Sequence, residues 1–303
     1  MSVLSKPYFH DEAAAFAHVE AIVWPTGPVC PHCGSDKSPY DLKATRVGLK
    51  KCSACRKQFT VRVGTVFESS HVPLFKWLQA VHLICSSKKG VSAHQLHRIL
   101  EVTYKTAWFM AHRIREAMRS GDLAPLGVGG GFVEADETFI GRKKGVEKKG
   151  GGFGHKMKVM SLVERGREVR SIVLDKVSRK TVEDVIAANV HHEARLRTDT
   201  AQYYVRSGFG TANHKMVNHF IGEYVRGDAH TNTLEGFFSI FKRGMKGIYQ
   251  HCAEKHLHRY MAEFDFRYNT RTAVGGTDAM RAEKALKGIV GKRLTYKTSD
   301  AIA

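Results

Sequence analysis

Two sets of residues in this 303-residue chain have types and spacings that could do chemistry. The first consists of two Cys-x2-Cys pairs, Cys30 with Cys33 and Cys52 with Cys55, which are separated by 18 residues. Each pair can form a tight turn that places two thiolates on one ion, and two such turns complete a closed, tetrahedral zinc site. Disulfides are the alternative, but they are rare in the reducing cytosol, where a chain without a secretory signal is expected to lie. The spacing therefore predicts a structural zinc ion in a zinc ribbon.

The second set is acidic. Residues 132–141 alternate apolar and polar side chains as a strand does, yet they carry Glu134, Asp136 and Glu137 within four positions. Acids are poor strand formers, so this stretch needs a functional explanation. Asp199 ends a later predicted strand, and Glu235 lies in a helix predicted over residues 231–243. Converging carboxylates repel one another unless cations neutralise them, so Asp136, Asp199 and Glu235 together predict a metal site.

Carboxylates that share a site favour hard cations. Two Mg²⁺ or Mn²⁺ ions, held by these acids and by substrate phosphate, would suit in-line attack on a phosphodiester. Three further acids are secondary candidates that we interpret as structural: Glu134, Glu137 and Asp228.

Helices are predicted to follow the cysteine pairs. Short strands are expected near residues 40–43 and 58–63, before the pattern changes to helical periodicity. Pro73 can open a helix that runs to about residue 84. Ser92 can cap a second helix over residues 93–100, and Thr103 a third that ends near residue 118. The short helix, tight turn and longer helix resemble a helix-turn-helix, although a plain helical bundle explains the same pattern.

The second half of the chain is predicted to form a mixed sheet with flanking helices. Strands over residues 132–141, 158–163 and 168–177 precede a helix over residues 181–191, a strand over residues 194–200 and the helix that carries Glu235. This order is typical of an RNase H-like core, in which Asp136 lies in the middle of its strand and Asp199 near the end of the neighbouring central strand.

The predicted fold class is therefore a multi-domain α+β or α/β protein. Five segments are expected: an N-terminal helix and zinc ribbon (1–70), a helical DNA-binding region (71–120), a Gly-rich linker (121–131), the RNase H-like domain (132–271), and a C-terminal helix with a basic tail (272–303).

Charge indicates the partner. The chain has 48 Lys and Arg against 29 Asp and Glu, a net charge of +19 and a pI of about 9.7. Residues 1–120 hold 17 of the basic and 8 of the acidic residues, so both parts of the chain are basic. This excess predicts a nucleic-acid partner rather than a basic enzyme with no polyanion partner. The composition is otherwise average, which excludes collagen-like, coiled-coil and disordered classes, and no apolar run is long enough for a membrane span.

Contacts with DNA are predicted for basic residues of both parts. The third helix supplies some, and the basic loop that follows the acidic strand can clamp the DNA backbone beside the metal site. The predicted DNA-binding residues are Lys105, Arg113, Arg115, Arg142, Lys143, Lys144, Lys148, Lys149 and Arg243.

Taken together, these motifs resemble a known family. They are Cys30-Pro-His-Cys-Gly with Cys52-Ser-Ala-Cys-Arg, then Val133-Glu-Ala-Asp-Glu-Thr-Phe-Ile-Gly, Thr198-Asp199, His230-Thr-Asn-Thr-Leu-Glu-Gly-Phe-Phe-Ser-Ile-Phe-Lys-Arg-Gly and Arg267-Tyr-Asn-Thr-Arg. The chain resembles the bacterial insertion-sequence DDE transposases of the ISXO-like group over nearly its whole length.

The resemblance implies that Asp136, Asp199 and Glu235 are the metal-binding triad, with Asn232 as the alternative third ligand. It also implies a functional Lys242, which lies two helical turns after Glu235 and could hold a phosphate. The implied protein binds the terminal inverted repeats of its element, then cuts and joins strands as a homodimer or larger synaptic complex in the cytoplasm, on the nucleoid. A catalytically inert DNA-binding regulator and a structure-specific nuclease are the alternative functions.

Overall fold

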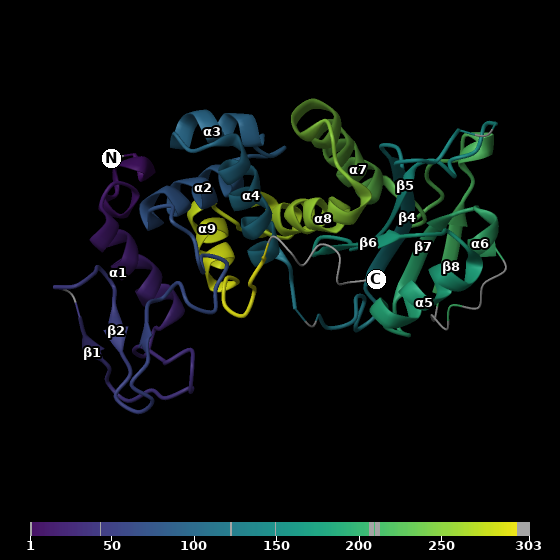
Figure 1. The fold of residues 1–303 in the computed structure, drawn as a ribbon. Helices are drawn as coiled ribbons and strands as arrows, with labels where there is room; N and C mark the ends of the chain where they lie inside the picture. The colour runs from purple at the N-terminus through teal and green to yellow at the C-terminus, as the bar shows by residue number, and fades with distance from the viewer. Residues whose placement is uncertain are drawn as a thin grey trace. The chain divides into compact units, whose positions relative to one another are not determined.

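The computed structural model describes residues 2–42, 44–121, 123–148, 150–205, 209 and 213–295. The chain forms two compact units (Figure 1). The first comprises Met1–Arg119 together with Gly276–Ala303, and the second comprises Ser120–Gly275.

The first unit begins with a small three-stranded sheet and a helix. Strands β1 (Tyr40–Asp41), β2 (Lys50–Lys51) and β3 (Gln58–Phe59) pair antiparallel in that order. Two 3₁₀ turns, η1 (Val3–Ser5) and η2 (Pro7–Phe9), precede α1 (Glu12–Val23). The Asp11 side chain accepts a hydrogen bond from the Ala14 N–H and caps α1. Phe59 packs with Cys30 and Cys52 in a small core, so the cysteine pairs and the sheet stabilise one another.

Four helices form the rest of the first unit: α2 (Leu74–Ser86), α3 (Ala93–Leu100), α4 (Tyr104–Met118) and α9 (Asp278–Lys287). The hydroxyls of Ser92 and Thr103 cap α3 and α4 through the Gln95 and Thr106 amides, as the sequence predicts. Glu101 adopts a left-handed conformation (φ 51°) and ends α3. The predicted short helix, tight turn and longer helix are therefore present in the fold.

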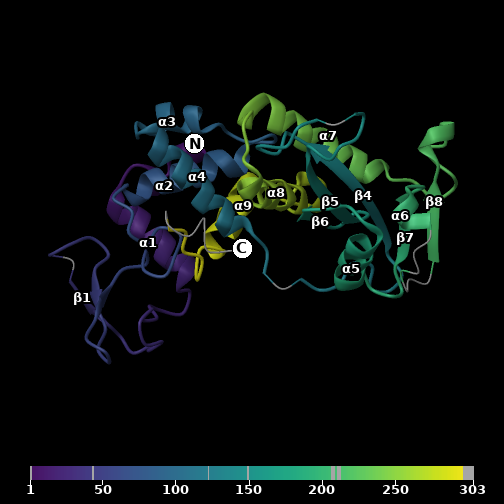
Figure 2. The ribbon, with the colours of Figure 1, turned by 45° about the vertical axis from the view of Figure 1, so that its right-hand side comes forward.

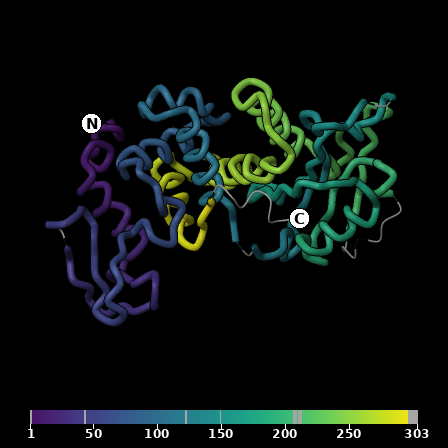
Figure 3. The backbone as a smooth tube through the Cα atoms, in the orientation of Figure 1, coloured from purple at the N-terminus to yellow at the C-terminus, as the bar shows by residue number. Residues whose placement is uncertain are grey.

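Helix α9 returns to the first unit from the far end of the sequence, as the yellow segment of Figure 3 shows beside the blue ones. The Arg281 guanidinium donates to the Cys85 carbonyl at 2.9 Å, and Gly291 N–H donates to the Gly64 carbonyl at 2.8 Å. Gly288 is required here because a Cβ at that position would lie 2.2 Å from the Ala117 carbonyl oxygen. The sequence predicts this helix in a separate C-terminal segment, residues 272–303. The structure instead groups it with the first unit.

The second unit is built on a five-stranded mixed sheet in the order β6-β5-β4-β7-β8. Its strands are β4 (Phe132–Ile140), β5 (Met157–Glu164), β6 (Val169–Leu174), β7 (Arg195–Asp199) and β8 (Asn213–Val217). Strands β4, β5 and β6 pair antiparallel, whereas β7 is parallel to both β4 and β8. This arrangement confirms the predicted mixed α/β class and is consistent with an RNase H-like core.

Helices cover both faces of this sheet (Figure 2). Helices α7 (Asn232–Gly244) and α8 (Glu254–Asn269), joined by the π-helix η4 (Met245–Tyr249), bury apolar side chains such as Phe241 and Phe264 against β4 and β5. Helices α5 (Arg179–Asn189) and α6 (Gln202–Val205) pack on the other face through residues such as Ile186 and Tyr204. The turns η3 (His219–Ile221) and η5 (Thr272–Val274) complete the described elements.

Several elements differ from the sequence-based prediction. Helix α5 begins at Arg179 rather than at residue 181, and the Ser178 hydroxyl caps it by accepting from the Thr181 N–H. The sequence analysis did not anticipate β8, α6 or α8. The predicted linker is also partly wrong: Leu126 is 1% exposed, belongs to the core beside α5 and pairs with Val190. Residues 126–131 are therefore part of the second unit, because an apolar side chain and backbone hydrogen bonds hold them there.

Candidate functional site

The pairing of β4 with β7 brings the first two candidate acids level with each other. Phe132 pairs with Arg195 and Glu134 with Arg197, an offset of 63 residues. The same offset, continued for two more residues, places Asp136 beside Asp199. Paired residues of neighbouring strands point to the same face, and the strands lie about 4.8 Å apart. Both carboxylates therefore rise from one face of the sheet, at the end of β7.

The electrostatics of Asp136 show that the acids interact. Desolvation is the largest cause that raises the pKa of Asp136 well above its usual value, followed by the negative charges of Glu137, Asp199 and Glu235. An uncompensated carboxylate at this position is therefore costly. A bound cation would offset both the desolvation of Asp136 and its repulsion by the neighbouring acids. The Asp199 side chain accepts a hydrogen bond from the Ala201 N–H at 2.9 Å, which fixes one of its oxygens.

Helix α7 supplies the third acid. Glu235 lies in its first turn and is exposed, with Thr231 Oγ1 at 3.5 Å and His219 Nε2 at 3.7 Å from its Oε1. Lys242 is exposed two turns farther along, and Arg243 donates to Ser239 on the same helix. Asn232, the alternative third ligand, is exposed at the first position of α7. Asp199 and Glu235 both act electrostatically on Asp136, but among the described residues the oxygens of the three acids do not all lie within 4.8 Å of one another.

The residues around these acids suit hard cations. Carboxylate oxygens are the ligands that Mg²⁺ and Mn²⁺ prefer, and the repulsion at Asp136 marks the point where positive charge is needed. Asp136, Asp199 and Glu235 would hold the ions.

The four predicted zinc ligands do converge. The sulfur atoms of Cys30, Cys33, Cys52 and Cys55 all lie within 4.8 Å of one another, and none is in a disulfide. Cys30 Sγ lies 3.7 Å from Cys55 Sγ, and Cys33 Sγ lies 3.7 Å from Cys52 Sγ. Zn–S bonds of about 2.3 Å in a tetrahedron put sulfurs about 3.8 Å apart, so the cluster fits zinc.

Local hydrogen bonds favour a thiolate in this cluster. The Cys55 N–H donates to Cys52 Sγ at 3.4 Å, and together with the Ala54 N–H it lowers the pKa of Cys52 to about 6. Thiolates, not thiols, bind zinc.

Two family models match the chain. Residues 10–58, which include all four cysteines, match a transposase zinc-ribbon domain. Residues 129–269, which include the three acids and Lys242, match an ISXO2-like transposase domain. In both regions the chain is thus similar to the ISXO2-like transposases of insertion sequences. An uncharacterized protein in the transposable element ISH50 of Halobacterium salinarum is 29% identical over 276 residues, which cover 86% of this chain and 91% of that protein. The family resemblance inferred from the sequence is confirmed.

The structure changes the interpretation of two DNA-binding candidates of this transposase. Arg113 and Arg115 are only 6% and 2% exposed. Arg113 donates to the carbonyls of Val66 and Glu68, so it holds a loop of the first unit. Both were predicted from their place on a basic helix, but both are buried and cannot reach a phosphate there. Lys105, on the first turn of α4, is exposed.

The basic loop after β4 likewise contains both exposed basic residues and one that is paired within the fold. Arg142, Lys144 and Lys148 are exposed. Lys143 forms an ion pair with Glu254 on α8, so its charge is already compensated within the fold. Lys149 lies outside the described residues. Within the residues that the structure describes, no helix is both long and apolar enough to cross a membrane.

Sequence reasoning missed the partners of the two other acids of β4. Glu134 is fully buried and accepts hydrogen bonds from α7 and Arg165. Glu137 accepts hydrogen bonds from the hydroxyls of Tyr203 and Tyr204, and desolvation raises its pKa to about 7. The Tyr-Tyr pair shortly after Asp199 is a signal that could have been used, whereas nothing local links Glu134 to α7.

The remaining clusters do not extend the site. Asp228 forms ion pairs with Lys215 and Arg197, which lower its pKa, so it is a structural partner of a buried arginine. His191, His192 and Glu193 form a group of possible metal ligands, in which His191 is half-buried and the other two are exposed; the sequence pattern did not predict this proximity.

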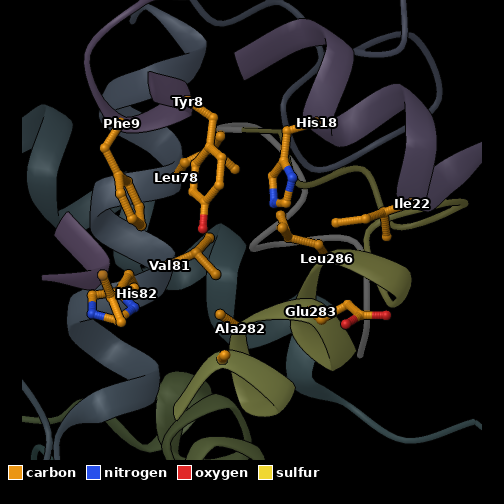
Figure 4. Close-up of a pocket in the computed structure, with 12 residues that line it drawn as sticks. Tyr8, Phe9, His18, Ile22, Leu78, Val81, His82, Ala282, Glu283 and Leu286 are labelled. Atoms are coloured by element: carbon orange, nitrogen blue, oxygen red, sulfur yellow. The ribbon is translucent and has the colours of Figure 1, made fainter. Parts of the chain in front are cut away.

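A cavity of about 170 Å³ lies within the first unit (Figure 4). The Tyr8 and His18 rings stack there with centroids 4.0 Å apart, and Leu78, Val81 and Leu286 supply apolar surface. This lining does not suit a polyanionic substrate.

Proposed function

We propose that this chain is an active DNA transposase, which binds the terminal inverted repeats of its insertion sequence and then cuts and joins DNA strands at Asp136, Asp199 and Glu235. The observation that carries the proposal is the β4–β7 register, whose offset, extended two residues beyond Glu134 and Arg197, brings Asp136 level with Asp199 on the face of the sheet that α7 covers. The electrostatic interaction of Asp136 with both Asp199 and Glu235 supports it.

The reaction would consist of two displacements at phosphorus. Water attacks the phosphodiester at the element end, the P–O3′ bond breaks, and a 3′ hydroxyl is released. That hydroxyl then attacks a phosphodiester of the target, a new P–O3′ bond forms, and a target 3′ hydroxyl leaves. When bound, two Mg²⁺ or Mn²⁺ ions would supply Lewis-acid stabilisation of the attacking and leaving oxygens.

The protein residues have separate tasks in this scheme. Asp136 and Asp199 hold one side of the cation site, and Glu235 approaches it from α7. Lys242 is exposed and can hold a non-bridging phosphate oxygen through its ammonium group. Arg142, Lys144, Lys148 and Arg243 are exposed on the same unit and can contact the DNA backbone.

The first unit would recognise the element ends. Its zinc ribbon stabilises a small basic sheet, and α3 and α4 provide a helix-turn-helix arrangement with Lys105 exposed. Because two ends must be processed together, we expect a homodimer or a larger synaptic complex.

The test is a cleavage and strand-transfer assay on DNA that carries the element ends. Asp136→Asn, Asp199→Asn and Glu235→Gln should each lower the rate roughly 10² to 10⁴-fold without weakening end binding, because each removes a cation-neutralising charge. Asp184→Asn is the matched control, since Asp184 is an exposed acid on α5, against the opposite face of the sheet.

Four outcomes would contradict the proposal in whole or in part. Cleavage that is unchanged in EDTA would exclude the metal-dependent mechanism. A wild-type protein that binds ends but never cuts them would be a DNA-binding regulator, and one that cuts but never joins would be a nuclease. If Glu235→Gln is active and Asn232→Ala is not, Asn232 is the third ligand instead.

A further inference from the structure

The acidic stretch of β4 contains three carboxylates, but only Asp136 faces the proposed cation site with Asp199. Glu134 and Glu137 contact other elements. We propose that these two glutamates are positioning residues: Glu134 places α7 and with it Glu235, and Glu137 places the segment after Asp199. This inference rests on the proposed catalytic function of the three acids.

Glu134 caps the helix that carries Glu235. Thr231 precedes α7 but gives no side-chain cap, so the first amides of the helix need another acceptor. Glu134 Oε2 accepts from the Thr233 N–H at 3.0 Å and from the Leu234 N–H at 3.1 Å. These are the second and third helical positions, whose amides an N-cap side chain normally satisfies. The cap thus comes from a strand about 100 residues away in the sequence. The last amide that it satisfies, that of Leu234, immediately precedes Glu235.

The remaining contacts of Glu134 fix the same junction. Its Oε1 accepts from the Thr233 hydroxyl at 2.8 Å and from Arg165 Nε at 2.7 Å. The same guanidinium donates to the Asp228 and His230 carbonyls, just before α7 begins. His230 Nδ1 lies 3.2 Å from Glu134 Oε1. Because Glu134 is 0% exposed and its contacts are donors, only a carboxylate can accept all of these hydrogen bonds.

Glu137 performs the corresponding task on the other face of β4. Its carboxylate accepts from the Tyr203 hydroxyl at 2.5 Å and from the Tyr204 hydroxyl. Both tyrosines lie on α6, and the Tyr204 N–H donates to the Ala201 carbonyl at 2.8 Å. The Ala201 N–H in turn donates to Asp199 Oδ1 at 2.9 Å. A continuous set of hydrogen bonds thus joins Glu137 to the carboxylate of Asp199.

Side chains alternate between the two faces along a strand, and Glu134 and Glu137 are three positions apart. They therefore point to opposite faces and contact elements on different sides of the sheet. The two elements carry or follow the other two acids of the proposed triad. Their placement therefore depends on the same short stretch that contains Asp136. This arrangement explains why a strand in the centre of the sheet contains so many carboxylates.

The first experiment measures positioning without activity. In the full-length protein, Glu134→Gln should speed hydrogen exchange of the Thr233 and Leu234 amides roughly tenfold or more, because the glutamine NH₂ would face donors. It should also weaken Mn²⁺ binding, measured by electron paramagnetic resonance without DNA, by roughly tenfold. Thr233→Val, which removes one hydroxyl donor, is the milder variant and should cause smaller changes in the same direction. Unchanged exchange in both variants would overturn the inference for Glu134.

Metal dependence separates positioning from simple stabilisation. Excess Mn²⁺ should restore most of the cleavage by Glu134→Gln but none by Asp136→Asn. Faster exchange with wild-type Mn²⁺ affinity would show that Glu134 only stabilises the fold, which contradicts the proposal. Asp136→Asn should leave exchange at Thr233 unchanged. If Asp136→Asn cleaves normally, the proposed function fails, whatever Glu134→Gln does.

Glu137 is tested by comparing two substitutions. Glu137→Gln can still accept one tyrosine hydroxyl and donate to the other, so it should keep near-normal Mn²⁺ affinity. Glu137→Ala should bind Mn²⁺ roughly tenfold more weakly than the wild type does. Asp184→Asn is the charge-matched control and should match the wild type. If Glu137→Ala binds Mn²⁺ as the wild type does, Glu137 does not position Asp199.

Discussion

Arg113 on α4 donates a hydrogen bond to the Val66 carbonyl at 2.9 Å, and the same nitrogen donates to the Glu68 carbonyl at 2.8 Å. A guanidinium in a basic helix thus serves the interior of the first unit. The Cζ atom of Arg113 also lies 4.6 Å from the centroid of the Phe109 ring, which adds to this packing. The positive charge of the unit is consequently divided between residues that hold the fold and residues that remain exposed for DNA.

This division predicts opposite effects for two substitutions. Arg113→Ala should lower the free energy of unfolding of the first unit by roughly 2 to 4 kcal/mol, because it removes the guanidinium donor from the buried Val66 carbonyl and from the half-buried Glu68 carbonyl. Tryptophan fluorescence reports this unit alone, since Trp24, Trp77 and Trp108 all lie in it. The salt dependence of DNA binding should stay as steep as in the wild type.

Lys105→Ala is the counterpart. Lys105 is exposed, so stability should change by less than about 0.5 kcal/mol. A plot of the logarithm of the DNA-binding constant against the logarithm of salt concentration should become less steep by about one unit of slope, as expected for the loss of a single phosphate contact. A wild-type affinity that does not respond to salt would contradict both expectations and leave the net charge of +19 without a polyanion partner.

The zinc site gives a second prediction. Cys52→Ser should abolish bound zinc, unfold the small sheet of the first unit and remove specific end binding, because that sheet has little apolar core besides the cysteines and Phe59. Metal analysis of the purified protein measures the zinc. The second unit should keep its circular dichroism and its Mn²⁺ binding. Cys85→Ser is the control thiol, since Cys85 lies in α2 and outside the cluster. A Cys52→Ser protein that retains zinc would refute the four-cysteine site.

The contact of Leu126 with the sheet unit gives a third prediction. Leu126→Ala should destabilise the second unit by roughly 2 to 4 kcal/mol, because the side chain is 1% exposed in the core beside α5. Leu123→Ala, three residues earlier and 42% exposed, should have little effect. Denaturation followed by far-ultraviolet circular dichroism tests both. Equal, negligible effects would mean that residues 121–131 form a linker after all.

Local signals in the sequence predicted most helix ends and the central strands. Ser92 and Thr103 cap their helices through residues three positions away, so their effect can be read from a short segment. The alternation of residues 132–141 likewise reveals both the strand and the faces of its acids. Asp136 and Asp199 could be placed in strands for the same reason.

Long-range partners could not be predicted in this way. Helix α9 contacts α2 through Arg281 and Cys85, which are 196 residues apart. The cap of α7 by Glu134 spans about 100 residues, and neither segment contains a signal for the other. The burial of Arg113 depends on which face of α4 meets Val66. Such contacts follow from packing, which a pattern along one chain does not contain.

The last prediction concerns pH. Asp265 on α8 accepts hydrogen bonds from the Ser171 N–H at 2.8 Å and the Ser171 hydroxyl at 2.7 Å. Desolvation raises the pKa of Asp265 to about 7 despite these bonds. An unfolded aspartate has a pKa of about 3.9, so between pH 4 and 7 the folded state holds a proton that the unfolded state releases. The stability of the second unit should therefore fall as pH rises from about 4 to 7 and level off above 7.

Asp265→Asn removes this dependence with little change of shape. The asparagine oxygen can accept from the Ser171 N–H, and its NH₂ can donate to the Ser171 hydroxyl. Above pH 7 the variant should be more stable than the wild type, by at most about 4 kcal/mol for a shift of about three pKa units, and the difference should shrink toward pH 4. Urea denaturation at a series of pH values, without divalent cations, measures it. Because Asp136 and Glu137 also have raised pKa values, both proteins should still lose stability as pH rises, and only the difference between them reports Asp265. A difference that stays constant from pH 4 to 8 would show that Asp265 is ionised in the folded protein throughout this range.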